Sequence, residues 1–130
     1  MVLMVDDDDD ALEIYKMLVE RTPFSDNFIT KNDGIEALNF LQECHDHNKN
    51  HFPRYIVLDL NMPGFGGVEF IRKYEEQFHA HFPQTEILIL TSSVREKDNE
   101  EVQEYESVSH FISKPLPKKK LISLIEKSTS

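Results

Sequence analysis

The side chains best placed for chemistry are carboxylates, a threonine and a lysine that stand at the ends of short apolar runs. They are Asp6 and Asp7 after residues 2–5, Asp59 at the end of 55–59, Thr91 at the end of 86–91, and Lys114 shortly after 111–112. Apolar runs of this kind are typical of strands buried on both faces of a parallel sheet. Ligands of open α/β sheets bind at the carboxyl ends of the parallel strands. We therefore expect these side chains to lie together at that edge of the sheet.

The chemistry that such an edge supports is phosphoryl transfer. Carboxylates brought together in a crevice repel one another, and a divalent cation relieves that repulsion. Carboxylate, carbonyl and water ligands favour Mg²⁺ or Mn²⁺. Lys114 and Thr91 would offer an ammonium and a hydroxyl to an incoming anion, and Asp59 would be the nucleophile that becomes an aspartyl phosphate.

The segments between the apolar runs have helical periodicity and must position these side chains. Apolar residues recur at helical spacing from Ala11, with Ile14 in the stripe, and again within 37–44, 68–78 and 121–125. We expect a polar helix over roughly 96–106 and a polar loop over 45–54. Strand and helix alternate five times, which predicts an α/β, doubly wound domain with a parallel five-stranded sheet and helices on both faces.

Composition limits the classes of function. A chain of 130 residues is expected to form one domain, and its net charge of −10 argues against direct binding of nucleic acid. We find no apolar run long enough to cross a membrane and predict no membrane association. The single cysteine, Cys44, suits a reducing compartment, so a cytoplasmic location is expected.

Four segments together resemble the response-regulator receiver domain of two-component signalling. They are residues 4–8, 57–64, 88–93 and 111–116, and the last two look like the short stand-alone, chemotaxis-type regulators of bacteria. The resemblance covers the whole chain, so residues 1–130 are expected to be one receiver domain. It implies the flavodoxin-like (βα)5 fold with strand order 2-1-3-4-5.

The resemblance also implies roles for single residues. Asp59 would accept a phosphoryl group from a histidine kinase or a histidine phosphotransfer protein. Mg²⁺ would be bound by Asp7 and Asp59 directly, by Asp6 through water and by Asn61 through its backbone carbonyl. Lys114 would pair with Asp59, and its peptide bond to Pro115 is often cis in the family.

Phosphorylation would be read through a switch. The resemblance implies that Thr91 turns toward the phosphoryl group and that Phe111 follows, which changes a docking surface for a downstream protein. That surface comprises the fourth helix, the fifth strand and the fifth helix, and a phosphorylation-linked homodimer through the last helices is a further hypothesis. The protein would be a signalling switch rather than an enzyme acting on a separate substrate.

Two other functions remain as alternatives. A phosphatase of the haloacid dehalogenase type also forms an aspartyl phosphate, but it needs a second Asp two residues after the nucleophile, where this chain has Asn61. A pseudo-receiver would dock partners without being phosphorylated. Gly66 stands where the family often has Asp, so we expect a looser loop there, and Asp9 stands where Pro is frequent.

Overall fold

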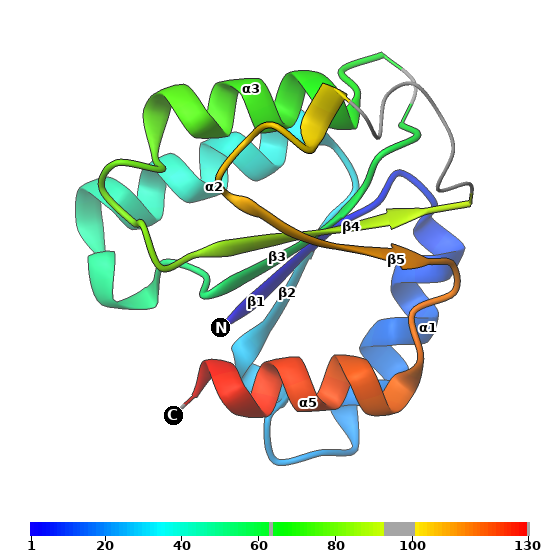
Figure 1. The fold of residues 1–130 in the computed structure, drawn as a ribbon. Helices are drawn as coiled ribbons and strands as arrows, with labels where there is room; N and C mark the ends of the chain where they lie inside the picture. The colour runs from blue at the N-terminus through cyan, green and yellow to red at the C-terminus, as the bar shows by residue number, and fades with distance from the viewer. Residues whose placement is uncertain (63, 93–100, 130) are drawn as a thin grey trace.

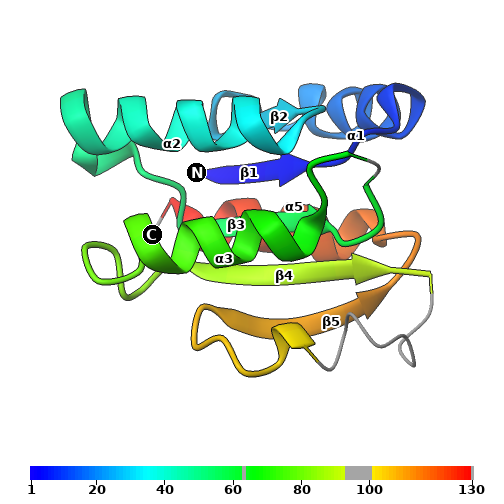
Figure 2. The same ribbon diagram turned by 90° about the horizontal axis from the view of Figure 1, so that it is seen from above.

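The computed structural model describes residues 1–62, 64–92 and 101–129. Its sheet has five parallel strands in the order β2-β1-β3-β4-β5, as predicted. The strands are β1 (Val2–Val5), β2 (Phe28–Lys31), β3 (Tyr55–Asp59), β4 (Glu86–Thr91) and β5 (Val108–Ser113). Figure 2 shows them side by side in that order.

The described α-helices cover both faces of the sheet. They are α1 (Asp9–Glu20), α2 (Gly34–His47), α3 (Gly67–Gln77) and α5 (Lys118–Ser128). Helices α2 and α3 lie on one face, and α1 and α5 lie on the other (Figure 1). The helix expected over 96–106 ends earlier than predicted. Residues 101 and 102 are helical and Val102 is fully buried, whereas residues 103–106 form turns that lead into β5, and residues 96–100 lie outside the described residues.

Two hydrophobic cores follow from the alternation of side chains along the strands. In β1, Leu3 and Val5 face α2 and α3, while Val2 and Met4 face α1 and α5. All four side chains are fully buried. This two-sided burial explains why β1 and β3 are apolar up to their carboxyl ends, whereas the edge strand β5 carries exposed Ser109 and His110.

Three other local predictions were wrong. Ile14 is 58% exposed, because α1 buries the stripe of Leu12, Tyr15 and Val19 instead. The predicted loop over 45–54 contains the last turn of α2 and the short 3-10 helix η2 (Lys49–His51), followed by the buried Phe52. The last strand is longer than 111–112, since pairing with β4 extends it over Val108–Ser113.

Aromatic rings make up much of the core beside α3. Phe70 and Tyr74 are fully buried, and the ring of Phe52 stacks on Phe82 with 3.6 Å between centroids. Another 3-10 helix, η1 (Ser25–Asn27), leads into β2.

In the part of the chain that is described, no helix is long and apolar enough to cross a membrane.

Candidate functional site

The predicted site residues meet at one edge of the sheet. Asp59 is the last residue of β3 and Thr91 the last of β4, while Asp6 and Lys114 directly follow β1 and β5. These strand ends all lie at the right of Figure 1. The parallel sheet therefore brings together side chains that are more than a hundred residues apart in the sequence.

Asp59 is at the centre of this edge. Only 2% of the residue is exposed, and its Oδ1 lies 3.0 Å from Nζ of Lys114. The backbone N–H of Asn61 donates to the same oxygen at 3.1 Å. Burying a carboxylate is costly unless it is paired and hydrogen-bonded, and the ammonium and the amide supply these partners for Asp59.

Three carboxylates form an acidic cluster beside this ion pair. One oxygen from each of Asp6, Asp7 and Asp59 lies within 4.8 Å of the others, and no second group of three His, Cys, Asp or Glu ligands meets this criterion among the described residues. Asp6 is buried and Asp7 is exposed. Hard oxygen ligands in this number could hold a divalent metal ion, and they fit Mg²⁺ better than a metal that prefers thiolate or imidazole.

The environment of Asp6 favours its neutral form. Burial raises the pKa of Asp6 to about 6, and the charge of Asp59 adds to the increase. The backbone N–H of Asp8, which donates to Oδ1 of Asp6 at 2.9 Å, and the charge of Lys114 oppose it. One ammonium group, that of Lys114, faces the three carboxylates of this cluster, so a bound cation would relieve the remaining repulsion.

Lys114 is held in place through its backbone. Its N–H donates to the carbonyl oxygen of Thr91 at 3.0 Å, and the Lys114–Pro115 peptide bond is cis, as the resemblance implied. Two residues later, the N–H of Leu116 donates to the hydroxyl oxygen of Tyr15 at 2.9 Å. Partial burial lowers the pKa of Lys114, but the bond to Asp59 and the surrounding carboxylates outweigh it, so its pKa is raised.

Thr91 and Phe111 lie on the same face of the sheet. Thr91 is fully buried and pairs in register with Ser113, while Ile89 pairs with Phe111. Residues two apart in a strand point to the same face, and Ile89 and Phe111 both contribute to the core under α2 and α3. Phe111 is half-buried.

The loop between β3 and α3 depends on close packing at Gly67. A Cβ on Gly67 would lie 2.7 Å from Cα of Leu60 and 2.9 Å from its carbonyl oxygen. The preceding Gly66 is the N-cap of α3, and its N–H donates to Oε2 of Glu69 at 3.0 Å. Glu69 therefore fixes the backbone N–H at the position where the family often has Asp.

Several supporting contacts were missed by the sequence analysis. The hydroxyl oxygen of Tyr15 accepts from the N–H of Leu116, and nothing in the local sequence marks this contact. Asp8 caps α1 by accepting from the N–H groups of Asp10 and Ala11, and Asp9 accepts from Nδ2 of Asn32 at 3.0 Å. Aspartates at 8–10 are the residue types that favour a helix start, because they cap the free N–H groups and complement the helix dipole.

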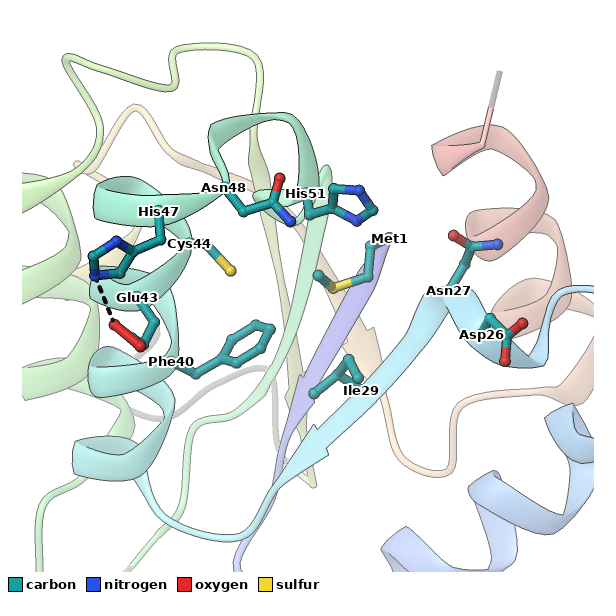
Figure 3. Close-up of a pocket in the computed structure, with 10 residues that line it drawn as sticks. All are labelled: Met1, Asp26, Asn27, Ile29, Phe40, Glu43, Cys44, His47, Asn48 and His51. Carbon is teal, nitrogen blue, oxygen red and sulfur yellow. Dashed lines mark ion pairs between the residues drawn. The ribbon is translucent and has the colours of Figure 1, made fainter.

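A separate cavity lies away from this site. Its volume is about 480 Å³, and it lies between the amino ends of β1 and β2 and the last turns of α2 (Figure 3). Met1, Phe40 and Cys44 are among its lining residues, and His47 pairs with Glu43 at 3.5 Å on its rim. None of the predicted site residues lines it, so its size does not bear on the chemistry at the other end of the sheet.

The chain belongs to the response regulator receiver domain family, because the model of that family matches residues 2–126. The response regulator Rcp1 of Synechocystis is 24% identical over 127 residues, which cover 97% of this chain and 84% of that protein. The family is that of the signalling switches of two-component systems, which interact with histidine kinases or phosphotransfer proteins and with downstream targets.

Solved structures agree with the fold. A two-component response regulator from Cytophaga hutchinsonii superposes with a TM-score of 0.76 at 26% identity, over 98% of this chain and 95% of that chain. The chemotaxis protein CheY4 of Vibrio cholerae gives 0.68 at 24% identity, over 98% and 96% of the two chains. The chain thus has the CheY-like, flavodoxin-like architecture.

Proposed function

We propose that this receiver domain is phosphorylated on Asp59 by a histidine kinase or a histidine phosphotransfer protein. The observation that carries the proposal is the buried Asp59 carboxylate, paired at 3.0 Å with Lys114 and bordered by Asp6 and Asp7. One oxygen of Asp59 would attack phosphorus, and the bond between phosphorus and the imidazole nitrogen of the donor would break. The imidazole keeps the electron pair of that bond.

Each remaining residue has a defined part in the proposal. Mg²⁺ held by Asp6, Asp7, Asp59 and the carbonyl of Asn61 would neutralise the charge that the carboxylates and the phosphoryl group bring together. The ammonium of Lys114 would pass from Asp59 to a phosphoryl oxygen. The Thr91 hydroxyl would bind another oxygen. Mn²⁺ has the same ligand preference and would substitute.

The output would be a changed docking surface. Thr91 and Phe111 share the face of the sheet that packs against α2 and α3, which supports coupling between the phosphoryl group and Phe111. The docking surface for a downstream protein would include β5, α5 and the helical segment that ends at Val102, of which residues 96–100 lie outside the described residues. Sedimentation with and without a phosphoryl mimic tests the proposed homodimer, which an unchanged monomer would exclude.

The chemistry at position 61 favours a switch over an enzyme. Asn61 cannot act as the general acid or base that a phosphatase of the haloacid dehalogenase type places two residues after its nucleophile. An aspartyl phosphate on Asp59 would therefore persist long enough to signal. The domain would catalyse only its own phosphorylation and dephosphorylation.

Intact mass after incubation with acetyl phosphate and Mg²⁺ tests this function. We expect one phosphoryl adduct on the wild type, none on Asp59→Asn, and none when EDTA removes the metal. Tight Mg²⁺ binding without an adduct would instead support a pseudo-receiver. Rapid release of phosphate without an adduct would support the phosphatase.

A further inference from the structure

The rim of the candidate site carries opposite charges on its two sides. The chain has a net charge of −10, and five consecutive aspartates, Asp6 to Asp10, lead from β1 into α1. On the other side, the first turn of α5 carries three consecutive lysines, Lys118, Lys119 and Lys120, called the lysine patch below. All three are exposed, and none forms an ion pair with another described residue.

The lysine patch opposes the stability of its own helix. The N-terminus of a helix has a partial positive charge, so acidic residues are favourable in the first turn and lysines are unfavourable. Helices α1, α2 and α3 follow this rule, each with an acidic residue in the first turn. Helix α5 has no acidic residue there and no side-chain cap at Pro117. The stability of α5 therefore does not explain why three lysines stand in its first turn.

The patch is close enough to act on the site. Lys118 is four residues after Lys114, so their Cα atoms are at most about 14 Å apart. The segment between them is anchored by the bond from Leu116 to Tyr15, and α5 begins at the same end of the sheet as α1 (Figure 1). The Debye length is about 8 Å at physiological salt and about 30 Å at low salt. At low salt the separation of Lys118 from Lys114 lies within the Debye length, so the field of the patch extends to the Lys114–Asp59 pair, whereas higher salt screens it.

We propose that the lysine patch steers the dianionic phosphoryl group of a donor to Asp59. A doubly negative group that approaches a protein of net charge −10, past five aspartates, is repelled. Three positive charges beside Lys114 offset that repulsion on one side of the rim and define the side of approach. This inference rests on the proposed function and adds the means by which the donor reaches the site.

The test compares initial rates of phosphorylation by acetyl phosphate at saturating Mg²⁺, measured by intact mass. The variant is K118Q/K119Q/K120Q, and the matched control is Lys127→Gln, an exposed lysine in the last turn of α5. At an ionic strength of about 0.02 M and limiting acetyl phosphate, we expect the triple variant to be about three- to tenfold slower than the wild type. At about 0.5 M the difference should vanish, and Lys127→Gln should resemble the wild type throughout.

Two further arms identify the cause as the electrostatic field. Neutralising the opposite side with D9N/D10N should raise the rate at low salt, and the rate at saturating acetyl phosphate should not change in the lysine variant. Mg²⁺ affinity gives a readout that needs no phosphorylation. The triple variant should bind Mg²⁺ more tightly at low salt, because the patch repels cations.

The outcomes separate this inference from the proposed function. An adduct that forms at the same rate, with the same salt dependence, in the triple variant and the wild type would overturn the steering role. The lysines would then be a solvated face. No adduct on any protein would overturn the proposed function and the steering role together, whatever the Mg²⁺ affinities show.

Discussion

Nζ of Lys114 lies 3.0 Å from Oδ1 of Asp59 and joins the ends of β5 and β3, two strands that are separated by β4. The ion pair therefore crosses the end of β4 and links two strands that are not neighbours in the sheet. It compensates the charge of the Asp59 carboxylate, a residue that is 2% exposed. It also places an ammonium group beside the carboxylate that would attack phosphorus.

The stability of the fold should depend on the ion pair between Lys114 and Asp59. Lys114→Met should lower the free energy of unfolding by about 1–2 kcal/mol without metal, since the lysine side chain is a third exposed and its loss leaves Asp59 unpaired. The double variant with Asp59→Asn should recover most of that loss, because no buried charge remains. Urea unfolding in EDTA measures both. Additive effects of the two substitutions would contradict the coupling.

The raised pKa of Asp6 predicts how stability depends on pH. The pKa is about 6 in the folded protein and 3.8 for the unperturbed group, so the folded state binds the proton more tightly. The resulting stabilisation is complete below pH 4 and is lost as pH rises through 6. Relative to the wild type, Asp6→Asn should gain about 1–3 kcal/mol between pH 4 and pH 7 in EDTA. Parallel stability curves for the two proteins would exclude this.

The hydroxyl of Tyr15 should support the segment that carries Lys114. Tyr15→Phe leaves the buried N–H of Leu116 without its acceptor, which should lower the free energy of unfolding by about 1–3 kcal/mol. Amide hydrogen exchange should quicken at Lys114 and Leu116, whose neighbours Pro115 and Pro117 have no N–H, and stay unchanged in β1 and β2. Exchange that quickens equally in all strands would indicate a general loss of stability instead.

Packing at Gly67 should fix the loop after Asp59. Gly67→Ala would drive a methyl group into the backbone of Leu60, 2.7 Å from its Cα, and should cost about 1–3 kcal/mol in thermal or urea unfolding. The matched control is Gly66→Ala, whose new Cβ would meet first the flexible end of Glu69 at 3.0 Å. The account requires the larger loss at Gly67, and equal losses would speak against it.

The fold and the positions of the site residues were predictable because they depend on patterns of short range. Apolar runs mark strands buried on both faces, and each run ends in a polar residue, so Asp6, Asp59, Thr91 and Lys114 could be assigned to one edge. Strand order came from the resemblance rather than from the pattern. The five-stranded parallel arrangement and its order are confirmed.

The sequence-based predictions were wrong or incomplete where tertiary packing determines which side chains are buried or in contact. Ile14 and Leu12 both fit a helical stripe, and only the direction in which α1 faces the sheet chooses Leu12. Phe52 lies in a polar stretch, yet it stacks on Phe82, thirty residues away in the sequence. The bond from Leu116 to Tyr15 joins residues that are 101 positions apart, which no local pattern can signal.

The most direct test of the central claim locates the phosphoryl group itself. Borohydride reduction converts an aspartyl phosphate to homoserine, and trypsin releases residues 55–72, in which Asp59 is the only aspartate. After treatment with acetyl phosphate and Mg²⁺, we expect homoserine at position 59 and unmodified aspartates at positions 6 and 7. Homoserine at another aspartate, with position 59 unmodified, would contradict it.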